Sequence, residues 1–195
     1  MALLKVSVFC SSSSLVNENF IRETDVLARN LVNEGFLIQY GGGGVGLMGR
    51  LADTVLSLNG KIRGIIPKFM VDEGWVHHNV TDMIVVNDMY DRKKKIMTET
   101  DAIIALPGGC GTLEELTEAI TLKQLGIISV PIIILNTGDF YNHLIRLFQI
   151  MMEENFFRKE HSSIWQIVDK AENVVSAIKN STPWDPVVAR NSAAI

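Results

Sequence analysis

Short runs of apolar and β-branched residues alternate with longer amphipathic segments along most of this chain. Seven runs have the composition of strands, at residues 6–10, 37–40, 62–66, 83–86, 102–106, 132–135 and 164–168. Helical periodicity covers residues 19–34, 46–58, 90–100, 113–125, 141–154 and 171–179. This alternation predicts an α/β fold, a Rossmann-like three-layer α/β/α domain with a mainly parallel sheet. The runs IIALP and PIIIL are apolar throughout, which is typical of central parallel strands.

The size and charge of the chain limit its organisation and its partners. Its 195 residues suit one domain, which we place at residues 1–181, followed by a loose C-terminal tail at residues 182–195. A net charge of −4 supplies no positive field for nucleic acid or an anionic membrane, so neither is expected as a partner. The longest apolar runs are too short to span a bilayer. Cys10 and Cys110 match neither a disulfide framework nor a metal spacing, and we expect reduced thiols in a cytoplasmic protein.

Three loops rich in glycine or serine follow predicted strands. They read CSSSS at residues 10–14, YGGGGVGLMG at 40–49 and PGGCGTLEE at 107–115. In a parallel sheet such loops share the carboxyl edge, where ligands bind, and their backbone N–H groups and hydroxyls can hold an anion. Together they predict a phosphate-bearing ligand, with Ser12, Gly43 and Gly44 as candidate phosphate ligands in the first two loops. The alternative for the serine loop is a hydroxyl that caps the next helix.

The second loop also contains the spacing G-x-G-x-x-G, as Gly44, Gly46 and Gly49. That spacing between a strand and a helix is the dinucleotide fingerprint. Here it follows the second strand rather than the first, and the next strand ends in Pro67 without an acid for the ribose hydroxyls. An NAD enzyme is therefore disfavoured, and we expect no cofactor. A tight turn for close packing is the other alternative, although six glycines in nine residues favour close approach to a nucleotide.

The third loop combines an anion-binding turn with carboxylates, and two interpretations remain open for it. Thr112 and Glu115 fit a capping box, in which the threonine caps a helix and the glutamate reaches back to a backbone N–H. Alternatively, the turn holds a phosphate while Glu115 performs chemistry. Nearby, DRKKK places Arg92 at a helix start, where an anionic ligand or Glu115 would compensate the unfavourable helix dipole. No metal-binding motif accompanies His77, so no metal site is expected.

Three motifs in order resemble one family. PGGCGTLEE matches P-G-G-x-G-T-x-x-E, YGGGGVGLMG matches the companion glycine loop, and MYDRKKKI matches M-x-x-R-K. Over roughly residues 5 to 180 the chain resembles the LOG family, the cytokinin riboside 5′-monophosphate phosphoribohydrolases, whose members were long labelled lysine decarboxylases. Tyr90 stands where many members carry histidine, which leaves the preferred base and N6 side chain open.

The resemblance implies an enzyme that hydrolyses the N-glycosidic bond of an adenine-type nucleoside 5′-monophosphate, such as a cytokinin riboside 5′-monophosphate or AMP. The products would be the free base and ribose 5-phosphate, and the enzyme would be a homodimer with active sites beside the interface. By position, Arg92 and Glu115 would be the catalytic pair. The implied phosphate and substrate ligands are Arg92, Lys93, Gly108, Gly109, Gly111 and Thr112.

Two other functions remain as alternatives to hydrolysis. A non-catalytic carrier or sensor would need the same loops to hold its nucleotide. A pyridoxal phosphate-dependent lysine decarboxylase would need a Schiff-base lysine and a partner for the pyridinium nitrogen, and the sequence identifies neither.

Overall fold

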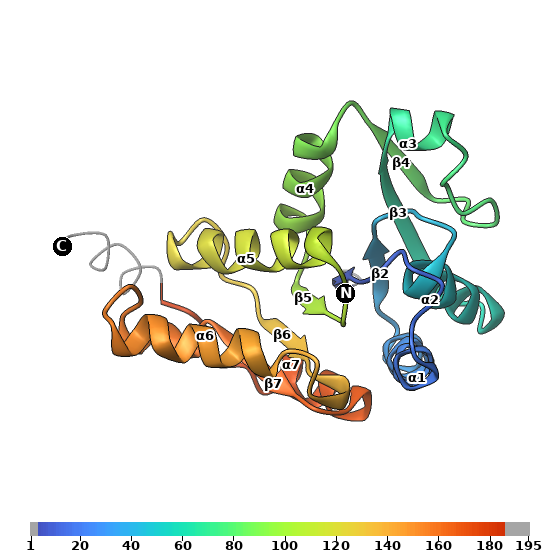
Figure 1. Cartoon of the computed structure of the whole chain (residues 1–195). Helices are drawn as coiled ribbons and strands as arrows, with labels where there is room; N and C mark the ends of the chain where they lie inside the picture. The colour runs from blue at the N-terminus through green and yellow to red at the C-terminus, as the bar shows by residue number, and fades with distance from the viewer. Residues whose placement is uncertain (1–3, 186–195) are drawn as a thin grey trace.

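The computed structural model describes residues 4–185, and they contain one seven-stranded sheet in which every pairing is parallel. The strand order is β4-β3-β2-β1-β5-β6-β7, and Figure 1 shows the chain winding outward from the centre in two halves. The strands are β1 (Lys5–Phe9), β2 (Leu37–Tyr40), β3 (Lys61–Pro67), β4 (Met83–Val86), β5 (Ala102–Ala105), β6 (Ile132–Leu135) and β7 (Trp165–Val168). All seven predicted strands are confirmed to within one residue at either end.

Helices cover both faces of the sheet, so the expected three-layer α/β fold is confirmed. They are α1 (Glu18–Asn33), α2 (Gly46–Ser57), α3 (Lys68–Asp72), α4 (Met89–Thr98), α5 (Cys110–Gln124), α6 (Asn142–Glu153) and α7 (Val174–Lys179). Short 3₁₀ turns lie at Thr137–Asp139, Lys159–Ser163 and Ala171–Asn173. The sequence did not predict α3, because a five-residue helix is too short to show periodicity and buries none of its residues.

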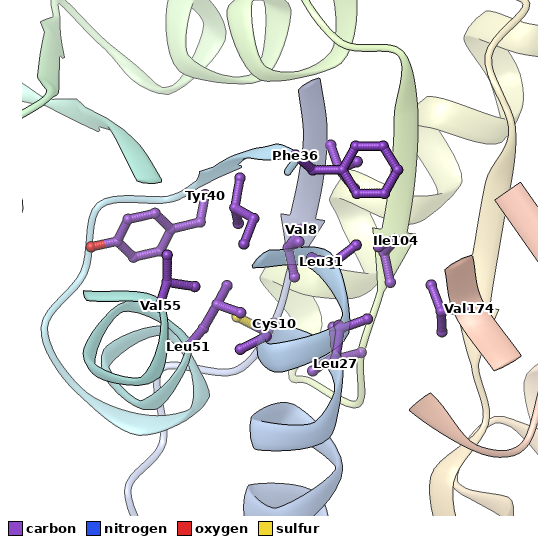
Figure 2. Packing of buried hydrophobic residues seen from close by; sticks show 14 of the residues in the cluster. Val8, Cys10, Leu27, Leu31, Phe36, Tyr40, Leu51, Val55, Ile104 and Val174 are labelled. Atoms are coloured by element: carbon purple, nitrogen blue, oxygen red, sulfur yellow. The ribbon is translucent and has the colours of Figure 1, made fainter. Parts of the chain in front are cut away.

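The sheet separates two hydrophobic cores. Alternate residues of one strand enter different cores: Val8 joins the core beneath α1, α2 and α7, while Phe9 joins the core beneath α4, α5 and α6. Figure 2 shows the first core, in which Leu27 and Leu31 of α1 lie near Val8 of the central strand. Two-sided burial accounts for strands that are apolar at every position. Among the described residues, none of the helices is long and apolar enough to cross a membrane.

Two helix starts differ from the sequence interpretations. Helix α5 begins at Cys110 with Gly109 as its N-cap, so Thr112 and Glu115 already lie inside the helix. The capping-box interpretation of this pair is therefore wrong. Helix α1 is capped by the side chain of Asn17, so the alternative of a serine hydroxyl as its cap is wrong too.

The segment after α7 also packs more closely than a loose tail would. Trp184, which we placed in the tail, is buried in the core beneath α4, α5 and α6. Residues 186–195 of the expected tail lie outside the described residues.

Candidate active site

A cavity of about 600 Å³ opens at the carboxyl edge of the sheet. The loops after β1, β2 and β5 line it together with α4 and the segment around α3. This volume is typical of a small-molecule site. The three loops that the sequence singled out therefore meet at one site, as the sheet topology requires.

The start of α5 forms one wall of the cavity and presents backbone donors to it. The wall includes Gly109, Gly111 and Thr112. The N–H of Leu113 bonds to the carbonyl of Gly109, whereas the preceding N–H groups of the first turn have no partner within the helix. Within the described chain no side chain caps Gly109, and the first turn of α5 carries no acid. These unsatisfied donors and the helix dipole make this wall suitable for a phosphate.

Gly108 supports that wall from behind rather than lining the cavity. A Cβ at this position would overlap Oγ1 of Thr112, so only glycine lets the Thr112 side chain lie against the turn. Thr112 is buried and also lines the cavity. Among the candidate phosphate ligands of the third loop, the structure therefore brings Gly109, Gly111 and Thr112 to the cavity, while Gly108 shapes their turn.

The first two loops divide their candidates in the same way. Ser12 and Gly43 line the cavity, whereas Gly44 does not. Gly44 instead donates its N–H to the carbonyl of Trp75, which ties the glycine loop to the segment after α3. A Cβ on Gly46 would press on the backbone of Ser12, and one on Gly49 would press on the carbonyl of Gly44. These glycines of the G-x-G-x-x-G spacing thus serve close backbone packing between loops.

Arg92 and Glu115 lie side by side in the cavity although they come from different helices. Nη2 of Arg92 is 3.5 Å from Oε1 of Glu115. Both side chains are 9% exposed, so solvent screens their attraction only weakly. Nε of Arg92 donates to the carbonyl of Ile65 at 3.2 Å, which anchors the guanidinium to β3. Burial raises the pKa of Glu115 above its usual range, and the positive charge of Arg92 opposes that rise.

Gly41, at the end of β2, provides the space for this arginine. A Cβ at Gly41 would overlap Nη2 of Arg92, the same nitrogen that faces Glu115. The sequence shows Gly41 only as one glycine in a run, and no local pattern indicates its contact with a helix about fifty residues later. Its role follows only from the way β2 and α4 meet.

Lys93 lies beside the cavity wall and not in it. Its Nζ is 2.7 Å from Oε1 of Glu114 and 2.8 Å from Oε2 of Glu118, and these contacts raise its pKa. Glu114 itself lines the cavity. The structure therefore places Lys93, one of the candidate phosphate ligands, as the counter-ion of two glutamates on α5.

Part of the cavity lining is apolar, and the sequence analysis did not identify it. Met48 of α2, Met70 of α3, Trp75 and Met89 line this part. The Phe69 and Trp75 rings meet edge to face at 6.4 Å, although Trp75 is 53% exposed. Methionine and tryptophan surfaces suit a flat or flexible apolar group. Trp75 lies outside all the motifs that the sequence analysis singled out, so no pattern could have placed it here.

The cavity has three chemical parts: an anion-binding helix start, a buried carboxylate with a guanidinium, and a set of apolar side chains. Residues 4–185 contain no group of three or more histidine, cysteine, aspartate or glutamate side chains placed to hold a metal ion. Such a site can hold an anionic group at the start of α5 and a planar apolar group against the methionine and tryptophan side chains, with a carboxylate in the same cavity.

Comparison with known proteins gives consistent relatives. The family model described as possible lysine decarboxylase matches residues 48–178. The cytokinin riboside 5′-monophosphate phosphoribohydrolase LOG5 of Arabidopsis thaliana is 35% identical over 188 residues, which cover 96% of this chain and 82% of the relative. The probable cytokinin riboside 5′-monophosphate phosphoribohydrolase LOGL1 of Oryza sativa subsp. japonica is 39% identical over 156 residues, which cover 80% of this chain and 70% of the relative.

Solved structures share the fold at lower identity. The molybdenum cofactor carrier protein of Chlamydomonas reinhardtii superposes with a TM-score of 0.69 at 16% identity, covering 91% of this chain and 97% of that chain. The molybdenum cofactor binding protein of Rippkaea orientalis gives a TM-score of 0.67 at 20% identity, covering 92% and 97%. At these identities the likeness shows a common fold.

Proposed function

Because this chain belongs to the LOG family of cytokinin riboside 5′-monophosphate phosphoribohydrolases, we propose that it hydrolyses the N-glycosidic bond of adenine-type nucleoside 5′-monophosphates. The substrates in this proposal are cytokinin riboside 5′-monophosphate, AMP or both, and the products are the free base and ribose 5-phosphate. The observation that supports it most is the Arg92–Glu115 pair, buried in the same cavity as the uncapped start of α5.

The phosphate and the reacting carbon occupy different parts of the cavity in this proposal. The 5′-phosphate binds at the start of α5, with Gly109, Gly111 and Thr112 around it. This anchoring places the ribose against Glu115, one turn further along the helix. The phosphate and the carboxylate therefore share a helix without touching, which resolves the apparent conflict between an anion-binding turn and its glutamates.

Glu115 supplies the chemistry. Breaking the glycosidic bond builds positive charge on the sugar, and a buried, fixed carboxylate stabilises that charge. A raised pKa also makes Glu115 a stronger base towards the attacking water than an ordinary glutamate. Arg92 holds the carboxylate in place and keeps it ionised. The base packs against the apolar part of the lining, which includes Met48 and Trp75.

A lysine decarboxylase fits this cavity poorly. Among the described residues no lysine lines it, whereas a pyridoxal phosphate enzyme binds its cofactor through a lysine Schiff base. The description attached to the family model therefore does not lead us to propose decarboxylation.

The proposed phosphate anchor predicts a strong preference for AMP over adenosine. The nucleoside lacks the charge-assisted hydrogen bonds to the start of α5, so its kcat/KM should be at least about tenfold lower. Steady-state assays of both compounds measure this ratio. Equal kcat/KM values would show that the start of α5 does not recognise the phosphate.

Replacing Lys93, the lysine beside the cavity, should shift the pH profile of kcat/KM. Glu115 acts as a carboxylate, so activity should fall as pH drops through its raised pKa. The charge of Lys93 lowers the pKa of Glu115, while Glu114 and Glu118 raise it. Lys93→Met should therefore move the acid limb of kcat/KM to higher pH. Lys95→Met is the matched control, because Lys95 pairs with Glu99 and should leave the limb in place. A limb that stays in place or moves down in Lys93→Met would contradict the proposed role of Glu115.

We also propose that the protein is a homodimer, as the family resemblance implies. Large apolar side chains after α5 and on α6 are exposed, among them Leu125, Ile127, Leu147 and Ile150. These side chains supply apolar surface of the kind that a subunit interface buries. Sedimentation velocity at micromolar concentration should give the mass of two chains, and the mass of one chain would refute the dimer.

A further inference from the structure

A second cavity of about 260 Å³ lies at the opposite edge of the sheet from the candidate active site. It is bounded by the last turn of α5, the starts of β6 and β7, and the segment after α7. Because the active-site cavity opens at the carboxyl ends of the strands, the two cavities have no lining residue in common.

Lys123, in the last turn of α5, is the one charged residue that lines this second cavity within the described chain. It is only 3% exposed. Between residues 4 and 185 its ammonium has no carboxylate or hydrogen-bond partner, whereas Lys93 on α4 contacts two glutamates. Burial lowers the pKa of Lys123 to about 8, so the group is still mainly protonated at neutral pH. A buried cation without a counter-ion is costly, and a protein normally pairs it.

The rest of the cavity lining carries no negative charge and combines polar side chains with the apolar residues Pro131, Ile132, Ile164 and Trp165. Hydroxyl and amide side chains line it at Ser163, Gln166, Asn180, Ser181 and Thr182. Nε2 of Gln166 donates to Oγ of Ser181 at 2.7 Å, which fixes both groups in the wall. Ser163, Asn180 and Thr182 are exposed while Lys123 is buried, so polar groups lie nearer the surface of the molecule than the cation does.

We propose that this cavity, which we call the Lys123 pocket, binds a small oxyanion, either a phosphate or a carboxylate, with the Lys123 ammonium as its counter-ion. The cavity has room for such a group. The hydroxyls of Ser163 and Ser181 already donate to backbone carbonyls, so the further hydrogen bonds to the oxyanion come from the second N–H of the Gln166 and Asn180 amides. The site is separate from the Arg92–Glu115 pair, so the proposal stands independently of the proposed hydrolysis.

Tryptophan fluorescence can report on this pocket once the tryptophan at the active site is replaced. Trp165 lines the Lys123 pocket. Trp184 packs in the same hydrophobic core as Trp165, with its ring 6.3 Å from that of His161. Trp75 lines the active-site cavity and is the third tryptophan of the chain. A Trp75→Phe background therefore removes the reporter at the active site, where phosphate should bind as well. This protein is titrated at pH 7 with inorganic phosphate and, separately, with acetate, while sodium chloride keeps the ionic strength constant.

The expected result is a saturable change in fluorescence. Adding Lys123→Met should weaken the apparent affinity at least about tenfold, because a charge-assisted hydrogen bond is lost. Lys123→Arg keeps the cation and should retain most of the binding. Lys61→Met is the matched control, since Lys61 is exposed on β3 away from the pocket and should leave the curve unchanged. Lys123→Gln is a second neutral variant, so a folding defect in one variant, seen by circular dichroism, does not stop the comparison.

The comparison of phosphate with acetate shows which class of oxyanion the pocket binds. Saturation by phosphate assigns the pocket to a phosphoryl group, and saturation by acetate alone assigns it to a carboxylate. The proposal is overturned if neither anion gives a saturable change in the Trp75→Phe protein. It is also overturned if the neutral variants of Lys123 give the same titration curve as their parent, because the lysine then does not bind the anion.

Discussion

Replacing Glu115 with glutamine is expected to lower kcat roughly a hundredfold or more, the scale of losing one preorganised electrostatic group. The substitution keeps the shape of the side chain and removes its negative charge. Glu115 is buried beside Arg92, so no dissolved ion can take the place of its negative charge next to the sugar. The start of α5 is unchanged, and nucleotide should still bind. Steady-state kinetics with AMP and a direct binding titration measure the two effects separately.

The matched control for this substitution is Glu114→Gln. Glu114 also lines the cavity, but it is paired with Lys93 and lies on the same helix without facing Arg92. Its replacement should change kcat far less than that of Glu115. Activity within a few-fold of wild type in Glu115→Gln would remove the catalytic role, and a non-catalytic nucleotide carrier or sensor would then become the better account.

Replacing Gly41 with alanine is expected to lower kcat about a hundredfold, although Gly41 carries no functional group. The added methyl overlaps Nη2 of Arg92, and this nitrogen faces Glu115. The guanidinium must move, because the backbone at the end of β2 is held in the sheet. A displacement of about 1 Å in a catalytic group costs on this scale. The measurement is kcat, with nucleotide affinity as the second readout.

Gly43→Ala provides the comparison in the same loop. A Cβ at Gly43 meets the Met48 side chain, with its terminal methyl at 3.0 Å, and that flexible side chain can move aside. This variant should retain a kcat much closer to wild type, even if its KM rises. Equal losses of kcat in both variants would show that Gly41 has no particular part in placing Arg92.

The strands and the meeting of the three loops could be predicted because they depend on patterns that are local in sequence. Fully buried strands read as unbroken apolar runs, and parallel topology then brings every loop at the carboxyl ends to one edge. Glu115 and the glycine turn could be found for the same reason, since one short segment carries both. The start of α5 was missed by three residues, because a cap of glycine without a side-chain bond leaves no sequence signal.

The remaining features depend on contacts between distant segments. In the sequence Gly41 is only one of several adjacent glycines. Its role becomes visible only in the fold, where α4 brings Arg92 against it. Lys93 looks like a phosphate ligand in the sequence, and only the approach of α4 to α5 shows it between Glu114 and Glu118. The apolar part of the cavity lining depends on Trp75, which reaches the site through the backbone pairing of Gly43 with Val76.

The most direct test of the proposed function is chromatography of the products formed by the unmodified protein. Purified protein is incubated with AMP and, separately, with isopentenyladenosine monophosphate, and the mixtures are analysed for free base and ribose 5-phosphate. Hydrolysis predicts equal molar amounts of the two products from at least one substrate, and none with the Glu115→Gln protein beyond its residual rate. Recovery of both nucleotides intact, together with measurable nucleotide binding, would contradict the proposed hydrolysis.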